Sequence, residues 1–236
     1  MTEKLVFLLD VDNTLLDGDR IVDDLRLHLE RELGSDNARR YWELFEVARA
    51  ELGYVDYLDS MQRLRRECEL KVAVGHRLLS VADFLIDYPF AERLYPRALE
   101  VLEYLGRQGT TVLLTDGDVV YQPRKLRHSG LWDAVAGRVL IYAHKEQRLA
   151  DVQQNYPAGH YVMVDDKLPI LAAMKTIWKD GLTSVFPRQG HYALDPAYLA
   201  GHAAADVTIE HIAELIGIEQ AQFMTPPKQW AAHSQA

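Results

Sequence analysis

The sequence predicts an α/β protein with a doubly wound parallel sheet, because short apolar runs alternate with helical patterns along most of the chain. The first run, Leu5–Leu9, is apolar throughout, which is typical of a strand buried on both faces of a parallel sheet. Similar runs predict strands at Thr111–Leu114, Val139–Tyr142, Tyr161–Val164 and Thr183–Phe186. A last, short strand is expected at Asp206–Ile209.

Helical periodicity fills the intervals between these runs. The patterns predict helices at Pro96–Leu105, Val119–Ser129, Lys145–Asn155, Leu168–Lys179 and His211–Ile216. Strands that alternate with helices in this way favour a parallel, Rossmann-like sheet with helices on both of its faces.

Residues 20–92 interrupt the alternation. Three stretches there carry apolar residues at helical spacing, the first of them Ile21, Leu25, Leu29 and Leu33. We therefore predict an all-helical domain over residues 20–92, inserted into an α/β core formed by residues 1–19 and 93–224. Residues 225–236 show no periodicity, and we expect a disordered tail there.

Composition restricts the class of protein. The chain has 236 residues, 48% of them hydrophobic and 26% charged, as in soluble globular proteins. A net charge of −9 argues against a nucleic-acid partner. The single cysteine, Cys68, excludes an intrachain disulfide, and the first apolar run is too short for a signal peptide or membrane span. We expect a cytoplasmic monomer or homodimer that binds neither nucleic acid nor membranes.

Two carboxylates follow the first predicted strand. Asp10 and Asp12 lie at its carboxyl end, where open α/β sheets bind their ligands. Carboxylates one residue apart repel each other unless a cation or another partner offsets the charge. Taken alone, the segment could also be an Asx-rich turn that caps the next helix.

The pattern Asp-x-Asp-x-Thr after an apolar strand resembles the first motif of the haloacid dehalogenase superfamily. The resemblance implies that Asp10 is a nucleophile that attacks phosphorus, that Asp12 is the general acid and base, and that Thr14 fixes the turn. True haloacid dehalogenases resemble this motif but lack the second acid, since a departing halide needs no proton. Asp12 therefore favours phosphoryl transfer.

Two further elements resemble the second and third motifs of this superfamily. Thr115 ends the second core strand, and the resemblance implies that Thr115, Asp116 and a lysine bind the phosphate. An alternative is that Thr115 caps the helix that begins near Val119. Lys145 follows the third strand, 30 residues after Thr115, and is the expected lysine, with Lys125 as its alternative.

The fourth element is the pair Asp165 and Asp166 at the end of the fourth core strand. It resembles a double-aspartate form of the fourth motif. With Asp10 and the Asp12 carbonyl, the pair would complete a set of oxygen ligands for Mg²⁺. Which of the two binds the metal directly stays open, and either could cap the following helix.

The four motifs in this order imply a Mg²⁺-dependent phosphatase that hydrolyses a small phosphomonoester through an aspartyl-phosphate. The helical insert matches the superfamily's small cap domain. A phosphomutase, or a low-turnover binding or regulatory protein on the same fold, remains an alternative. A phosphonatase is less favoured because it needs a cap lysine, and Lys71 is the one lysine between Ile21 and Arg93. Asp12 argues against a haloacid dehalogenase.

Overall fold

A parallel six-stranded sheet forms the centre of the computed structural model, which describes residues 4–67 and 72–225. The strand order is β3-β2-β1-β4-β5-β6, and every neighbouring pair is parallel. The strands are β1 (Leu5–Leu9), β2 (Thr110–Asp116), β3 (Val139–Tyr142), β4 (His160–Val164), β5 (Leu182–Pro187) and β6 (Val207–Ile209). The predicted doubly wound α/β sheet is thereby confirmed.

The sheet is buried on both faces. Phe7 of β1 belongs to one apolar cluster, whereas Val6 and Leu8 belong to the cluster on the opposite face, as the alternation of side chains along a strand requires. Helix α5 (Ala98–Gly106) directly precedes β2. The helices that follow β2 are α6 (Tyr121–His128), α7 (Leu131–Ala134), α8 (Leu149–Asn155), α9 (Leu168–Trp178), α10 (Gly190–Leu194), α11 (Pro196–Leu199) and α12 (Gln220–Met224). Short 3-10 turns are η1 (Phe90–Arg93), η2 (Lys145–Gln147), η3 (Lys179–Gly181) and η4 (Ile212–Leu215).

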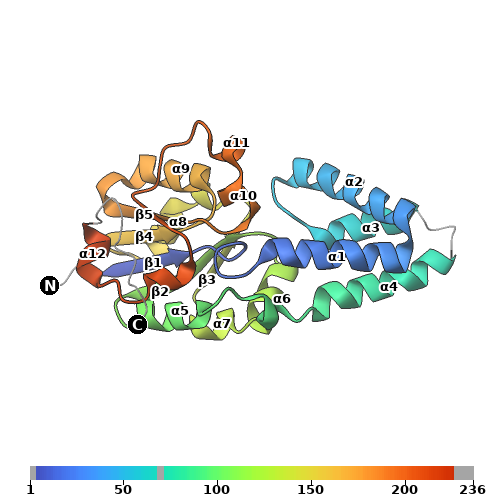
Figure 1. The fold of residues 1–236 in the computed structure, drawn as a ribbon, viewed down its shortest axis with the longest axis horizontal. Helices are drawn as coiled ribbons and strands as arrows, with labels where there is room; N and C mark the ends of the chain where they lie inside the picture. The colour runs from blue at the N-terminus through green and yellow to red at the C-terminus, as the bar shows by residue number, and fades with distance from the viewer. Residues whose placement is uncertain (1–3, 68–71, 226–236) are drawn as a thin grey trace.

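Of the helices between β1 and β2, the first four project from the carboxyl edge of the sheet (Figure 1). They are α1 (Gly18–Leu33), α2 (Ser35–Leu52), α3 (Tyr57–Glu67) and α4 (Val72–Asp87). Tyr41 of α2 is fully buried among them and donates a hydrogen bond to the carbonyl of Tyr57 at 3.0 Å. The helices contact the core through Arg124 of α6, which donates to the carbonyl of Ile86 at 2.6 Å. We call α1–α4 the inserted helices.

Several element boundaries differ from those predicted. Thr115 and Asp116 lie within β2, since the strand continues past the apolar run. The helix expected from Val119 begins at Tyr121, because the Asp118 carboxylate accepts hydrogen bonds from the backbone N–H groups of Val120 and Tyr121. The helix expected over Lys145–Asn155 is divided into η2 and α8, and the last expected helix is the 3-10 turn η4. The helix α3 has no counterpart among the predicted elements.

Three sequence-based expectations concern residues that the structure does not describe. Cys68 and Lys71 lie outside the described residues, as does the tail beyond Thr225. Thr225 itself donates to the carbonyl of Ala221. Within the described ranges, no helix combines the length and apolar character that crossing a membrane demands.

Candidate active site

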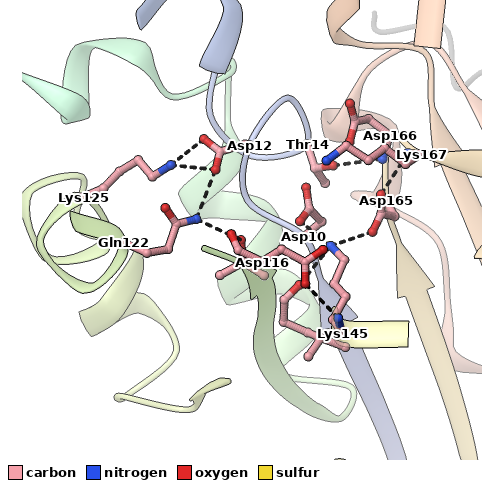
Figure 2. A network of polar contacts seen from close by, with 12 residues as sticks. Asp10, Asp12, Thr14, Asp116, Gln122, Lys125, Lys145, Asp165, Asp166 and Lys167 are labelled. Carbon is pink, nitrogen blue, oxygen red and sulfur yellow. Dashed lines mark hydrogen bonds and ion pairs between the residues drawn. The ribbon is translucent and has the colours of Figure 1, made fainter. Parts of the chain in front are cut away.

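Carboxylates and lysines gather where β1, β2 and β4 end (Figure 2). Asp10 directly follows β1, Asp116 ends β2, and Asp165 directly follows β4. Because these strands are adjacent and parallel, their carboxyl ends meet at one edge of the sheet. One carboxylate oxygen from each of Asp10, Asp165 and Asp166 lies within 4.8 Å of the others.

The loop after β1 is fixed by tight backbone contacts. Asn13 has a φ of 59°, a left-handed conformation that asparagine tolerates better than most residues. The hydroxyl of Thr14 accepts a hydrogen bond from the backbone N–H of Asp166 at 3.2 Å. The carbonyl of Thr14 accepts from Gln189 Nε2 at 3.1 Å. Thr14 thus joins the loop of Asp10 to the loop of Asp166.

Lys145 is the cation at the centre of this group. Its side chain is 1% exposed, and its Nζ lies 2.5 Å from Asp10 Oδ1 and 2.7 Å from Asp165 Oδ2. Burial disfavours the charged ammonium, but the charges of Asp10 and Asp165 outweigh burial and raise the pKa of Lys145 above its usual range. Lys145 therefore stays protonated beside Asp10.

Asp116 orients the loop that carries Lys145. The Oδ1 of Asp116 accepts a hydrogen bond from the backbone N–H of Lys145 at 2.8 Å. Burial raises the pKa of the Asp116 carboxyl, with the charge of Lys145 acting in the opposite direction. The structure thus shows a positioning contact for Asp116, which the sequence predicts as a phosphate-binding residue.

Asp10 and the two aspartates after β4 have different surroundings. Burial raises the pKa of Asp10, although Lys145 opposes the rise. Asp165 Oδ1 accepts from the backbone N–H of Lys167 at 2.8 Å. Neither carboxylate oxygen of Asp166 has a hydrogen-bond partner among the described residues, and both are buried. Burial and the charge of Asp165 hold the pKa of Asp166 well above its usual range.

A second lysine holds Asp12. The Nζ of Lys125 lies 2.6 Å from both carboxylate oxygens of Asp12, and the Lys125 residue is 4% exposed. Gln122 Nε2 donates to Asp12 Oδ2 at 3.0 Å. Burial opposes the ionisation of Asp12, but Lys125 and Gln122 outweigh it and place the pKa of this carboxyl below its usual range. Figure 2 shows Asp12 turned toward α6 and away from Asp165.

Thr115, near the end of β2, is linked to Asp12 through Gln122. Its hydroxyl accepts a hydrogen bond from Gln122 Nε2 at 2.9 Å, so one amide joins Thr115 to Asp12. The alternative role of Thr115 as a helix cap is wrong, because Asp118 Oδ1 accepts from the backbone N–H of Val120 at 2.8 Å and of Tyr121 at 2.6 Å.

Sequence reasoning missed two side chains and misjudged a third. Lys125 is predicted only as a surface-type alternative to Lys145, and Gln122 is not predicted at all. Lys167 follows Asp165 and Asp166 directly, and its ammonium lies 5.2 Å from the centroid of the Tyr192 ring. Burial lowers the pKa of Lys167, but the charges of Asp166 and Asp10 outweigh this effect and raise it. Lys167 could have been predicted as a site residue from the sequence, because it directly follows Asp165 and Asp166.

Comparison with known proteins identifies the family. The family model of haloacid dehalogenase-like hydrolases matches residues 5–177. The chain belongs to this family of hydrolases. A search of curated proteins gave no match.

Solved structures resemble the chain along most of its length. A protein from Burkholderia xenovorans LB400, assigned to the haloacid dehalogenase-like hydrolases, is 58% identical, with a TM-score of 0.85 over 92% of this chain and 99% of the other. A Bacillus subtilis hydrolase of the same superfamily, solved with bound magnesium, is 18% identical, with a TM-score of 0.57 over 91% and 97%. The L-2-haloacid dehalogenase of Xanthobacter autotrophicus is 16% identical, with a TM-score of 0.56 over 89% and 96%. The last two likenesses concern the fold alone.

Proposed function

We propose that this hydrolase cleaves phosphomonoesters of small metabolites, with Asp10 as the nucleophile and Asp12 as the general acid and base. The observation that carries the proposal is the second carboxylate. Asp12 comes two residues after Asp10 and is held by the buried Lys125. Gln122 donates hydrogen bonds to both Asp12 and Thr115. A reaction that expels halide has no need of such a group, whereas a departing alkoxide needs a proton.

The chemistry follows from the placement of the charges. Attack by an Asp10 oxygen on phosphorus breaks the ester bond and forms an aspartyl-phosphate, while the departing alcohol oxygen takes a proton from Asp12. An incoming phosphate dianion raises the pKa of Asp12 and so favours its protonated form. Asp12 then removes a proton from the water that hydrolyses the aspartyl-phosphate. Lys145 and Thr115 are proposed to hold the phosphoryl oxygens.

The donor set fits a divalent cation. Three carboxylates converge, and the buried oxygens of Asp166 lack a hydrogen-bond partner in the described part of the chain. Oxygen-only ligands of this kind suit Mg²⁺. We propose that Asp10, Asp165 and Asp166 hold Mg²⁺, with the Asp12 carbonyl as a further ligand. When bound, the ion would supply positive charge to the phosphoryl oxygens.

We propose that residues 20–92, which include most of the inserted helices, act as a cap domain over the candidate active site. They project beyond the same sheet edge at which the carboxylates gather (Figure 1). Closure of such a domain excludes bulk water during phosphoryl transfer.

The first test is the variant Asp10→Asn. Hydrolysis of p-nitrophenyl phosphate with Mg²⁺ should fall by about 10³-fold or more, since an amide is a poor nucleophile. Circular dichroism should stay unchanged, because the amide can still accept a hydrogen bond from Lys145. Asp180→Asn, at an exposed position, is the matched control.

Three results would contradict the proposal or redirect it. Activity of Asp10→Asn within tenfold of wild type would remove Asp10 from its role. Chloride release from 2-chloropropionate without any phosphatase activity would show a dehalogenase. Transfer of the phosphoryl group to a sugar in place of water would show a mutase.

A further inference from the structure

A cavity lies between the inserted helices and the sheet, next to the candidate active site. Its volume is about 310 Å³. The inserted helices contribute Tyr54 and Asp56, from the loop that joins α2 to α3. The core contributes residues 117–120, which follow β2, and residues 141–143 at the end of β3.

The core wall of the cavity is continuous with the candidate catalytic residues. Gly117 comes two residues after Thr115, and its N–H donates to the carbonyl of Tyr142 at 2.9 Å. Ala143 comes two residues before Lys145. On the opposite wall, a Cβ added to Gly53 would lie 2.5 Å from His144 Nε2, so the α2–α3 loop rests directly on the segment that carries Lys145. The cavity therefore borders the two segments that carry Thr115 and Lys145.

The lining combines carbon surface with negative charge. Val119 is 81% exposed and Val120 62% exposed, which is unusual for two consecutive valines and leaves apolar surface at the cavity. Asp118 is only 8% exposed, and its Oδ2 has no hydrogen-bond partner among the described residues. Tyr54 and Tyr142 add aromatic surface with polar ends.

No described basic side chain neutralises the two acids of the cavity. Asp56 and Asp118 form no ion pair within the described ranges, whereas nearby Asp59 is paired with Arg63 at 2.6 Å. Neither lysine nor arginine contributes to the lining. Burial and the charge of Asp118 raise the pKa of the Asp56 carboxyl, so the two carboxylates are close enough to repel each other. An additional anion in the cavity would be repelled.

We propose that this cavity receives the alcohol part of the phosphate ester and selects alcohols that carry an ammonium or hydroxyl groups over those that carry a carboxylate or a second phosphate. The proposal rests on the proposed phosphohydrolase function and specifies its substrate class. Asp118 Oδ2 and the Asp56 carboxylate accept hydrogen bonds from the alcohol, and the two valines contact its carbon atoms.

Three esters of similar size test the selection: phosphoethanolamine, ethylene glycol monophosphate and phosphoglycolate. Their binding to the Asp10→Asn protein with Mg²⁺ is measured by calorimetry, so that no turnover is needed. Phosphoethanolamine should bind most tightly and phosphoglycolate about tenfold or more weakly, as like charges in a half-buried site require.

The variant Asp56→Asn assigns the effect to the cavity. Asparagine can still accept the hydrogen bond that Asp59 N–H gives Asp56 Oδ1 at 2.8 Å, so the loop should keep its form. The ratio of the Kd for phosphoglycolate to the Kd for phosphoethanolamine should fall severalfold. Asp36→Asn is the matched control, because it makes the same charge change near the other end of α2 and should leave the ratio intact.

The inference is overturned if phosphoglycolate binds as well as phosphoethanolamine, if Asp56→Asn leaves the preference unchanged, or if none of the three esters binds. The proposed function is tested separately by hydrolysis of p-nitrophenyl phosphate. An active wild-type enzyme without the binding preference would refute the inference alone.

Discussion

Asp10 and Asp12 are two residues apart in the sequence, yet each is paired with its own lysine. Lys145 approaches Asp10 from the loop after β3, and Lys125 approaches Asp12 from the middle of α6. Two adjacent carboxylates would otherwise repel each other and gain protons. Each lysine favours the charged form of its own carboxylate, and the two carboxylates face different parts of the site.

Asp12→Ala should affect substrates in proportion to the basicity of the leaving group. Alkyl phosphates, whose alkoxides need a proton, should lose about 10²- to 10⁴-fold in the phosphorylation step, the range for general acid catalysis. The activated ester p-nitrophenyl phosphate should lose much less. Single-turnover kinetics measures the two losses, and equal losses would mean that Asp12 serves another purpose.

Lys125→Met tests whether the buried lysine prepares Asp12 as a base. Without the ammonium, burial should raise the pKa of Asp12, so less carboxylate is available to activate water. The kcat should fall while KM changes little, and p-nitrophenol should appear in a burst followed by a slower steady state. Lys4→Met, at an exposed position, controls for the substitution itself. A loss confined to KM would instead place Lys125 in substrate binding.

At the scale of elements, the apolar strands were the easiest features to predict. Leu5–Leu9 was predicted with its observed bounds, because complete burial leaves an uninterrupted apolar run. Boundaries set by polar contacts were missed, as where Asp118 delays the start of α6. Lys145 and four acids could be predicted because they stand at or just after strand ends. The four acids are Asp10, Asp116, Asp165 and Asp166. Lys125 could not, because its partner is 113 residues away and a helix-borne lysine is usually exposed.

Asp206 ties the last two strands to α9, and its removal should cost stability in a pH-dependent way. Its Oδ2 accepts from Lys175 Nζ at 2.7 Å and from the backbone N–H of Ser184 at 2.8 Å. Burial opposes ionisation, but these partners outweigh it and lower the pKa of Asp206. Asp206→Asn should lower the free energy of unfolding at pH 7 by about 1 kcal/mol, a value reduced for the partial exposure of the pair.

The sign of the pH dependence follows from the lowered pKa. The stabilisation is present above the unfolded pKa of about 3.9 and is lost as the pH falls through the lower folded value. Urea unfolding of wild type and Asp206→Asn should therefore converge toward pH 3. Asp180→Asn, at an exposed site nearby, should match wild type at both pH values. A deficit of equal size at pH 7 and pH 3 would exclude a charge effect.

At the scale of the whole molecule, positive and negative charges are closer to balance in the candidate active site than in the chain as a whole. The net charge is −9, but Asp10, Asp165 and Asp166 are accompanied by Lys145 and Lys167. With all three aspartates ionised, the two ammonium groups leave one negative charge unbalanced. Asp166 is the carboxylate without a hydrogen-bonded partner in the described structure. The folded protein therefore carries an internal cost that a bound cation would remove.

This cost predicts how Mg²⁺ changes the stability of the whole protein. Binding to the folded state alone adds about 2.7 kcal/mol when the free ion is at about 100 times its Kd. For a chain of this size each kcal/mol shifts the Tm by roughly 2–4 °C, so thermal unfolding of wild type should shift upward by roughly 5–10 °C. Calcium should give a different increment, because it prefers longer bonds and more ligands.

Asp166→Asn separates a metal ligand from a structural aspartate. The amide removes a buried carboxyl whose pKa is raised by burial and by Asp165, and a raised carboxyl pKa destabilises the folded state increasingly as the pH rises above the unfolded value. In EDTA at pH 8 the variant should therefore be at least as stable as wild type, while its Mg²⁺-induced Tm shift should largely disappear. Asp180→Asn should keep the full shift. If Asp166→Asn instead lowers the Tm in EDTA and retains the Mg²⁺ increment, Asp166 stabilises the fold and the metal lies elsewhere.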